Sequence, residues 1–460
     1  MNDALKTDLY QPSMSLGYKE AGKGDEIATY ELSLRKLPPH RNYLVIGGIA
    51  EIIEYLQNLQ FTKAQLDYLR QFPQFANLPS LKSLEGFRFT GDVFGMRDGT
   101  IAFQNEPVLY VRGPRWQAQY VETYLLGKFR SLTKFASRAS RIVDAAGGSS
   151  ILEFGSRHID PVLAPICAKA AYMAGCAGTS NVEAGFLYGI PIEDIRGTMA
   201  HAYIESFPTE LEAFRAYAKT YPDSAVLLVD TYDTGQGIKN AIIVAKELEA
   251  AGHKLRGIRI DSGDIAKDTK LARRLFADAD LDYVKIVVSG DMDENKIVEL
   301  KRKGAEIDII GVGKAISTLD DAPHLDASYK LCEHEIGGKT DYAIKLSEGK
   351  ATWPGLKQIY RILENNQYSE DFIRLANEPA GVGAPLIKKL MENGRLVYSI
   401  FDLNFARNFL NAQKRLLSSE LRGTGDAAYK VEFSDKLKTL QAITRQGAEQ
   451  RNGVVRKQTA

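Results

Sequence analysis

The fold is decided by five short apolar segments that each end abruptly in glycine or charged residues: SILEFGSR (150–157), AVLLVDTYD (225–233), RGIRIDSGD (256–264), KIVVSGDMD (285–293) and IDIIGVGK (307–314). Strands about 25–30 residues apart with a helix between them are β/α units, and such units form a parallel sheet. The segments are continuously apolar, which predicts that helices cover both faces of this sheet.

Helical segments separate these strands. In 237–252, Ile238, Ile242, Ala245 and Leu248 fall on one stripe, and Gly252 ends the pattern as a helix cap would. The spacing does not distinguish a barrel from an open, doubly wound sheet. No G-x-G-x-x-G follows a first strand, which weakens a dinucleotide-binding interpretation. We therefore predict an α/β protein with a β/α barrel.

The flanking regions differ from this pattern. Residues 41–61 carry apolar residues at helical spacing, and 87–113 alternate around Gly91-Asp92 and Asp98-Gly99, which predicts antiparallel hairpins. A long helix over about 115–140 should lead into the next domain, and 341–354 resembles another hairpin.

Three parts follow from these changes in pattern. We predict an N-terminal domain over 1–130, with a helical lead to about 149, a barrel over 150–335, and C-terminal segments over 336–460. The polar end, 451–460, is expected to fray.

The composition excludes several classes of protein. The 59 basic and 58 acidic residues leave a formal charge of +1, so nothing general favours nucleic acid or an anionic membrane. Cys167, Cys176 and Cys332 form no C-x-x-C pair, which argues against a disulfide framework or structural zinc. No signal-like or membrane-spanning apolar run occurs, and this predicts a soluble, cytoplasmic protein.

Polar residues gather where the predicted strands end, and in parallel β/α folds these ends meet on one catalytic face. The charged and hydroxyl residues there are Arg157, Asp230, Asp233, Arg259, Asp261, Asp264, Ser289, Asp291 and Lys314, with Gly263, Gly290, Gly311 and Gly313 between them. Glycines let backbone N–H groups approach an anion, acids hold a divalent metal or sugar hydroxyls, and bases neutralise phosphate. The pattern predicts a site for a phosphorylated sugar with a metal, although Asp-Ser-Gly-Asp by itself is also a helix cap.

His201 is the other notable residue. It follows Gly197-Thr198, where a strand is expected to end, and no second histidine lies at metal-ligand spacing. It could be a hydrogen-bonded structural residue, a general base, a phosphate contact or a nucleophile toward phosphorus.

In combination, these motifs resemble nicotinate phosphoribosyltransferase over about residues 7–335. The matching segments are TDLYQPSM (7–14), EFGSRH (153–158), GTSNVEAG (178–185), RGTMAHAYIESF (196–207), VDTYDT (229–234), RIDSGD (259–264), SGDMDE (289–294) and IGVG (310–313). The resemblance implies an α/β sandwich domain, built from N- and C-terminal segments, beside an irregular β/α barrel. It also implies a homodimer with interfacial active sites, to which the Tyr10 loop contributes.

The resemblance further implies the reaction and its residues. Nicotinate and phosphoribosyl pyrophosphate would give nicotinate mononucleotide and pyrophosphate in NAD salvage, coupled to ATP hydrolysis through a phosphohistidine at His201. The implied nicotinate-binding residues are Tyr10, Phe154, Arg157, Ser180, Thr198 and Arg259. The implied phosphoribosyl pyrophosphate residues are Arg35, Lys36, Asp261, Ser262, Gly263, Gly290, Asp291, Gly311, Gly313 and Lys314, with Mg²⁺ at Asp261. His201, Asp261 and Arg259 would be catalytic.

Some residues qualify this interpretation. Relatives that use nicotinamide tend to have Asp at the position of Ser180, so Ser180 favours the acid. Many family members have Arg at His158 and Thr or Ser at Lys314, and both departures lie near the expected anion sites. Arg35 and Lys36 could equally be a solvated basic pair.

Other functions stay open at this point. Nicotinamide or quinolinate could be the pyridine substrate. A barrel sugar-phosphate lyase would need a Schiff-base lysine, for which Lys285 is the candidate. A relative that binds metabolites without catalysis is the third alternative.

Overall fold

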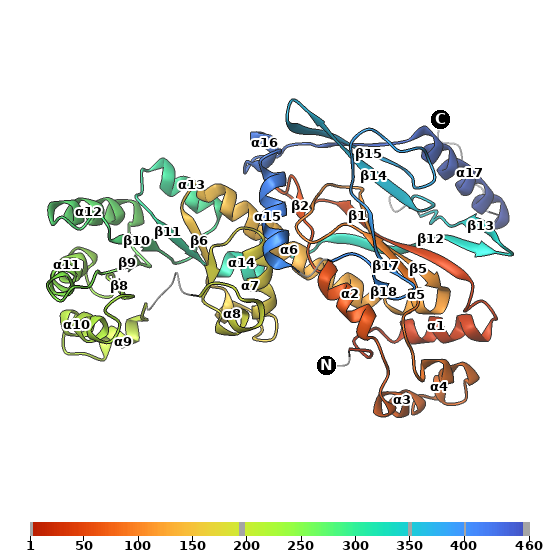
Figure 1. Cartoon of the computed structure of the whole chain (residues 1–460), viewed down its shortest axis with the longest axis horizontal. Coiled ribbons are helices and arrows are strands. Elements are labelled where there is room, and N and C mark those ends of the chain that lie inside the picture. Colours follow the sequence, from red (N-terminus) through yellow and green to blue (C-terminus); the bar gives the residue numbers. More distant parts are fainter. Residues whose placement is uncertain (1–2, 193–197, 348–351, 400–401, 454–460) are drawn as a thin grey trace. The chain divides into compact units, whose positions relative to one another are not determined.

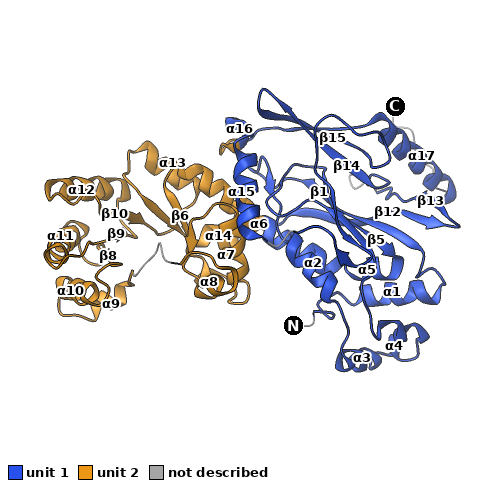
Figure 2. Cartoon of the chain, in the orientation of Figure 1, with its two compact units in different colours: residues 1–133, 324–421, 426–460 blue, residues 134–323, 422–425 orange. Residues whose placement is uncertain are grey.

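The chain forms two compact units. The computed structural model describes residues 3–192, 198–347, 352–399 and 402–453. Unit 1 consists of residues 1–133, 324–421 and 426–460, and unit 2 of residues 134–323 and 422–425 (Figure 2). Helix α6 (Glu122–Ala146) contains the boundary between 133 and 134. Both units mix helices and strands, so the predicted α/β class is confirmed.

Unit 2 is built on a parallel sheet in the strand order β7-β6-β11-β10-β9-β8 (Figure 1). Its strands are β6 (Ser150–Glu153), β7 (Gly178–Thr179), β8 (Val226–Leu228), β9 (Gly257–Ile260), β10 (Lys285–Val288) and β11 (Ile309–Val312). The five apolar segments of the sequence all form strands, each shorter than its segment. After β9 and β10 the polar residues begin directly, at Asp261 and Ser289.

The pairing of β6 with β11 brings the first and last strands of unit 2 together, as barrel closure requires. A further parallel bridge joins Thr198 to Val226 of β8, and the N–H of Thr179 in β7 donates to Pro191 O at 3.1 Å. Among the described residues the sheet is open between these two edges. The irregular barrel of the sequence analysis is thus a curved six-stranded sheet here, and residues 193–197 lie outside the description.

Helices follow the strands of unit 2, and most begin at residues whose side chains cap them. They are α7 (Ala164–Met173), α8 (Val182–Tyr188), α9 (His201–Glu205), α10 (Glu210–Thr220), α11 (Thr234–Ala250), α12 (Ile265–Asp278), α13 (Glu294–Arg302) and α14 (Lys314–Thr318), with the short 3-10 helix η2 (Ser156–His158). The side chains of Asp233, Asp264 and Asp293 accept hydrogen bonds from the first turns of α11, α12 and α13. These strand-end acids are therefore structural caps.

The described residues of unit 1 form three sheets. The largest is antiparallel, in the order β13-β12-β1-β5-β3-β17-β18; a second has the order β16-β14-β15-β19, and β2 pairs with β4. The strands are β1 (Ile27–Lys36), β2 (Leu44–Val45), β3 (Asp92–Gly95), β4 (Ile101–Ala102), β5 (Pro107–Pro114), β12 (Asp326–Ile336), β13 (Lys339–Tyr342), β14 (Lys357–Glu364), β15 (Gln367–Leu375), β16 (Ala384–Pro385), β17 (Lys388–Glu392), β18 (Arg395–Leu396) and β19 (Lys430–Phe433).

The helical segments of unit 1 contribute to its core. They are α1 (Tyr10–Glu20), α2 (Ile49–Asn58), α3 (Lys63–Arg70), α4 (Pro73–Ala76), η1 (Pro79–Leu84), α5 (Arg115–Tyr120), α15 (Leu403–Lys414), α16 (Ser419–Arg422, which ends in unit 2) and α17 (Asp435–Arg451). The apolar stripe of α2, including Ile49, Ile52, Ile53 and Leu56, is fully buried.

Three local predictions need correction. Asp98-Gly99 does not close a two-residue hairpin, because β3 before it pairs with β5 and β17, whereas β4 after it pairs with β2. The Asp98 carboxylate accepts from the N–H groups of Ile49 and Ala50 and caps α2. The helix predicted over 115–140 is divided at Val121 into α5 and α6. Of the hairpin expected at 341–354, only the first two residues lie in a strand, β13, which pairs with β12 across a turn at 337–338, and residues 348–351 lie outside the description.

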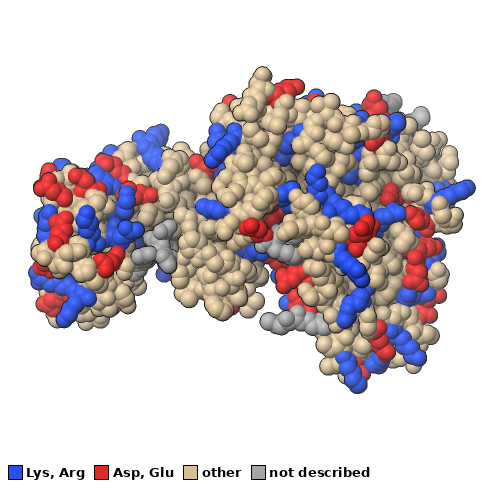
Figure 3. Space-filling view, in the orientation of Figure 1, with Lys and Arg blue, Asp and Glu red and all other residues tan. Residues whose placement is uncertain are grey.

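The charges on the surface and the polarity of the helices agree with the nearly equal numbers of acidic and basic residues in the sequence. Lysine and arginine side chains alternate with acidic ones over the visible face (Figure 3). Among the described residues, no helix is both long and apolar enough to cross a lipid bilayer.

Candidate active site

A cavity of about 470 Å³ opens at the carboxyl-terminal edge of the parallel sheet of unit 2. It is lined by Phe154, Arg157, His158, Arg259, Asp261, Ser262, Ser289, Gly290, Asp291, Lys296, Gly311, Gly313 and Lys314. Because the carboxyl ends of parallel strands share one edge, residues from four segments of the sequence meet here. Ten of the residues that the resemblance implicates line this one cavity.

The acidic side of the cavity is organised by hydrogen bonds between neighbouring strands. Asp230, after β8, accepts from the N–H of Asp261 at 3.0 Å and from Ser262 Oγ at 2.6 Å. Asp261, after β9, accepts in turn from Ser289 Oγ, after β10. The second carboxylate oxygen of Asp230 is buried, and it accepts no hydrogen bond from any residue that the structure describes.

At two positions of this edge only glycine fits, because neighbouring atoms lie where a Cβ atom would be. Gly290 has φ +86°, and a Cβ there would lie 2.0 Å from the carbonyl oxygen of Asp261. A Cβ on Gly311 would lie 2.3 Å from the ring of Phe154. Their missing side chains let the Asp261 turn and the Phe154 ring lie directly against the neighbouring strands.

Arg259 of β9 is mostly buried beside these acids. Its Nη2 donates to Met199 O at 3.0 Å, but its Nε is buried and has no acceptor among the described residues. Burial lowers the pKa of Arg259, while the charges of Asp261 and Asp230 oppose that shift. The hydroxyl of Thr198 is also buried, and residues 3–192 and 198–453, so far as they are described, offer it no partner. A buried donor left unpaired costs free energy, so Arg259 is prepared for an acceptor that a ligand would supply.

The loop after β6 is held by Glu153. Its carboxylate accepts from Thr179 Oγ1 at 2.6 Å and from the N–H of Gly155, and burial raises its pKa. The carbonyl of Glu153 accepts from the N–H of Ser180 at 2.9 Å. Ser180 is exposed and does not line the cavity, but Glu153 ties its segment to that of Phe154 and Arg157.

His201 begins α9 and is half-buried. Within the part of the chain that the structure describes, its one hydrogen bond joins Nδ1 to Thr231 Oγ1 at 3.1 Å. His201 does not line the cavity, and neither do Thr198 and Gly263. Thr198 and His201 nevertheless flank Met199, whose carbonyl holds Arg259.

Three candidate residues belong to unit 1. Tyr10 is the first residue of α1 and its side chain is 48% exposed. Arg35 lies 3.9 Å from Asp326, and Lys36 is an exposed residue at the end of β1. Their part in a shared site stays a prediction, because the cavity is formed entirely by residues of unit 2.

Lys296 lines the cavity and was missed by the sequence analysis. It lies in the first turn of α13, with Nζ 3.5 Å from the carbonyl oxygen of Gly290. Lys296 carries no strand-end signal, because it lies eight residues beyond Val288, the last residue of β10. The sequence signal that could have identified Lys296 is Asp293. Asp293 caps α13 and so places the first turn of this helix beside the strand ends.

The charge of the cavity favours anions. Arg157, Arg259, Lys296 and Lys314 are opposed by Asp261 and Asp291. Among the residues described, no group of three or more His, Cys, Asp or Glu could hold a metal ion. Asp230 and Asp261 can still supply carboxylate oxygens to a Mg²⁺ whose other ligands are water and phosphate, which is how Mg²⁺ usually binds. The unpartnered oxygen of Asp230 fits that arrangement.

Comparisons with known proteins agree over both units. The profile described as nicotinate phosphoribosyltransferase (NAPRTase) N-terminal domain matches residues 5–128. The nicotinate phosphoribosyltransferase pncB2 of Mycobacterium tuberculosis is 39% identical over 440 residues, covering 94% of this chain and 92% of that protein. The Bacillus subtilis nicotinate phosphoribosyltransferase is 41% identical over 383 residues, covering 82% and 76%. The crystal structure of human nicotinic acid phosphoribosyltransferase superposes with a TM-score of 0.84 at 26% identity, covering 95% of this chain and 99% of that one.

Proposed function

The chain belongs to the nicotinate phosphoribosyltransferase family, and we propose that it joins nicotinate to phosphoribosyl pyrophosphate, releasing nicotinate mononucleotide and pyrophosphate. The observation that carries this proposal is the cavity at the sheet edge, where Arg157, Arg259, Lys296 and Lys314 line the same space as Asp261, whose backbone N–H donates to Asp230. A doubly anionic sugar needs both kinds of group.

Nicotinate would lie against Phe154, with its carboxylate toward Arg259 and Arg157. The unpaired Nε of Arg259 and the unpaired hydroxyl of Thr198 support this assignment, since both are buried donors without acceptors. An aromatic face suits a pyridine ring. Ser180 adds no negative charge at its position, which favours the acid over the amide.

Phosphoribosyl pyrophosphate would occupy the remaining cavity. Asp261 would hold the ribose hydroxyls, and the 5′-phosphate would lie between the Gly290-Asp291 turn and the segment from Gly311 to Lys314. Lys296, which reaches the same turn, adds a cation there. As the pyridine nitrogen attacks the anomeric carbon, positive charge develops on the ribose and negative charge on the departing pyrophosphate. Arg35 and Lys36 remain proposed partners of that pyrophosphate.

Mg²⁺ is proposed as the accompanying ion, with Asp261 and Asp230 as its carboxylate contacts. When bound, it would neutralise charge on the leaving pyrophosphate. In this arrangement Ser289 and Ser262 keep the two carboxylates oriented through their hydroxyl hydrogen bonds.

ATP coupling through His201 is the finer part of the proposal. Nicotinate needs no deprotonation at its ring nitrogen, so a general base has no task in the transfer. With Nδ1 engaged by Thr231, Nε2 is the nitrogen available to accept a phosphoryl group. The added negative charge could draw basic residues toward the site and so couple ATP cleavage to substrate affinity.

A homodimer is proposed as the working form. Val162, Val182 and Phe186 of unit 2 are 79%, 72% and 87% exposed. Val182 and Phe186 lie one turn apart on α8, so they form an apolar stripe, and a second copy would cover it. Cytoplasmic localisation stays a prediction from the sequence.

The alternative of a Schiff-base lyase gains no support. Lys285 is the first residue of β10, at the sheet edge opposite the cavity, and it is paired with Asp308 at 3.2 Å. A Schiff-base lysine should instead lie in the substrate cavity with a depressed pKa.

The direct test is incubation with nicotinate, phosphoribosyl pyrophosphate and Mg²⁺, with and without ATP, followed by mass detection of the mononucleotide. We expect nicotinate mononucleotide in both cases and faster formation with ATP. Nicotinamide and quinolinate serve as competing substrates. Product from either of them at the rate seen with nicotinate would contradict the assignment.

A further inference from the structure

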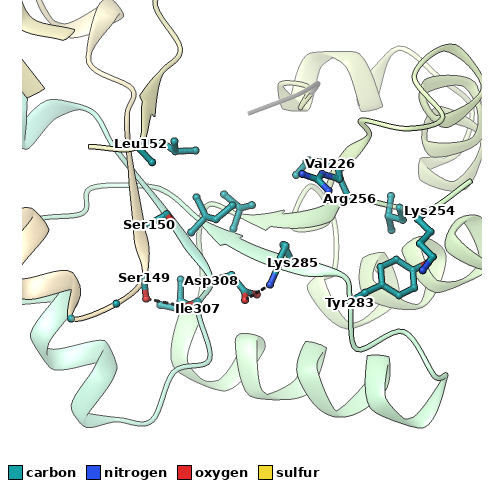
Figure 4. A pocket seen from close by; sticks show the side chains of 16 residues that line it. Ser149, Ser150, Leu152, Val226, Lys254, Arg256, Tyr283, Lys285, Ile307 and Asp308 are labelled. Atoms are coloured by element: carbon teal, nitrogen blue, oxygen red, sulfur yellow. Dashed lines mark hydrogen bonds and ion pairs between the residues drawn. The ribbon is translucent and has the colours of Figure 1, made fainter. Parts of the chain in front are cut away.

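A second cavity, of about 730 Å³, opens at the amino-terminal edge of the same parallel sheet (Figure 4). It shares no residue with the candidate active site. Strands β9, β10 and β11 connect the two edges. This cavity is lined by Arg256, which directly precedes β9, and by Lys285 and Ile309, which begin β10 and β11. The residues that follow the three strands line the other cavity. Its volume is in the range that holds a small organic ligand.

The rim of this cavity carries three cations from two chain segments. Lys254 and Arg256 precede β9, and Lys285 begins β10. Lys254 Nζ lies 4.9 Å from the ring centroid of Tyr283, which keeps this ammonium group over the ring. Asp308 is the one acid among the lining residues.

Asp308 neutralises only part of this rim, because it is shared between Lys285 and Arg273, which is not a lining residue. Its carboxylate accepts from Arg273 at 2.7 Å, from Lys285 at 3.2 Å and from the N–H of Ile286 at 2.9 Å. These partners lower the pKa of Asp308 despite its burial. Arg256 has no side-chain hydrogen bond or ion pair with any residue that the structure describes, and it is exposed. The rim therefore holds surplus positive charge.

The interior of the cavity is apolar. Leu152, Val226, Val287 and Ile309 line its wall, so a ligand would contact both this wall and the basic rim (Figure 4). An inorganic ion would leave the wall exposed to water. We propose that this cavity binds a phosphorylated organic metabolite of mononucleotide size, with its phosphate at Arg256 and Lys285 and its ring against the apolar wall.

Calorimetric titration tests this proposal with AMP, nicotinate mononucleotide and ribose 5-phosphate as probes, each added to the full-length protein. We expect saturable binding of at least one mononucleotide, weakened about tenfold or more by Arg256→Ala combined with Lys285→Ala, because each removes a charge-assisted bond to phosphate. Arg274→Ala, an exposed arginine on α12, is the matched control and should bind like the wild type. The double variant should keep its thermal midpoint, since Asp308 retains Arg273.

Arg157→Ala distinguishes the two cavities, because it removes a cation from the active-site cavity alone. Binding that Arg157→Ala weakens and the double variant leaves intact would assign the ligand to the active site and overturn the proposal. Failure of all three probes to bind at millimolar concentration, or equal binding of ribose 5-phosphate and the mononucleotides, would overturn it as well. None of these outcomes depends on whether the protein transfers a phosphoribosyl group.

Discussion

Two buried arginines show how differently the two units use charge. In unit 1, Arg361 of β14 donates to both oxygens of Asp371 and to Ile101 O at 2.7 Å. Its guanidinium also lies between the rings of Phe103 and Tyr368. In unit 2, Arg259 donates to Met199 O, and within the described part of the chain its Nε has no acceptor.

The pKa shifts follow the same contrast. Burial by itself lowers the pKa of Arg361, but Asp371 and Glu106 outweigh it and raise the pKa above its ordinary value. Burial also lowers the pKa of Arg259, and there the nearby acids only oppose the shift. A buried charge with complete partners stabilises the fold, whereas one with missing partners is kept for a ligand. Five predictions test this distinction, in order of decreasing effect.

Arg361→Met should lower the free energy of unfolding by about 3–5 kcal/mol, because Asp371 is left buried without its cation. Urea unfolding measures the change. Lys430→Met, which removes an exposed pair with Glu370, is the control and should cost about 1 kcal/mol or less. If the Met variant does not fold, Tyr429→Phe still tests the network through its bond to Asp371, with a loss of about 1 kcal/mol. An unchanged midpoint in both would contradict a stabilising role.

Asp261→Asn should reduce turnover at saturating substrates by about 100-fold, because in the proposed arrangement its carboxylate faces the positive charge that develops on the ribose. Its folding should be preserved, since an amide oxygen can still accept from Ser289. Asp264→Asn, which keeps a helix cap on α12, is the control. Wild-type turnover in Asp261→Asn would show that Asp261 is only a structural acceptor.

Arg259→Met should raise the KM for nicotinate by about tenfold or more, because the substrate carboxylate loses a charge-assisted hydrogen bond. Its free energy of unfolding should stay the same or rise, in contrast to Arg361→Met, since an unpaired buried donor disappears. Steady-state kinetics measures the KM for nicotinate, and urea unfolding measures the free energy of unfolding of the same preparation. A variant that loses stability as Arg361→Met does would abolish the contrast between the two arginines.

His201→Ala should remove ATP hydrolysis and the rate gain from ATP. ATP-independent transfer should stay within about twofold of wild type, because His201 does not line the cavity. His253→Ala, which removes an exposed histidine paired with Asp223, is the matched control. Complete loss of transfer in a folded His201 variant would instead assign His201 to the chemical step.

Glu106→Gln should have the smallest effect on the free energy of unfolding, about 1 kcal/mol or less near pH 5. The stability of the variant relative to wild type should then rise with pH. Burial raises the pKa of Glu106 in the folded protein, and the charge of Asp371 adds to the shift. Glu106 therefore contributes stability below its unfolded pKa of about 4.3, and that contribution is lost as pH rises toward the folded value. Glutamine does not titrate, so the variant should gain stability relative to wild type from pH 5 to pH 8. A variant whose stability falls relative to wild type over this range would contradict the raised pKa of Glu106.

The sequence predicted the parallel strands well because each carries its own apolar run and its own terminal polar residues. β9 and β10 illustrate this: the segments 256–264 and 285–293 contain both the strand and the site residues that follow it. The hairpins of unit 1 were predicted less well. Asp98-Gly99 has the local signature of a turn, but Asp98 caps α2, a helix about 40 residues earlier in the chain, and no local pattern contains that information.

By itself, the sequence determined which residues stand at strand ends, because alternation, apolar runs and glycine positions are local properties of the chain. The tertiary structure alone decided which of them share a cavity and which charges are satisfied. In the folded protein Asp233, Asp264 and Asp293 cap helices, and Lys296 lines the cavity. Arg259 and Asp230 each keep a buried atom that no described residue pairs with. Hydrogen-bond satisfaction depends on neighbours that are distant in the chain, so it is fixed only when the strands assemble.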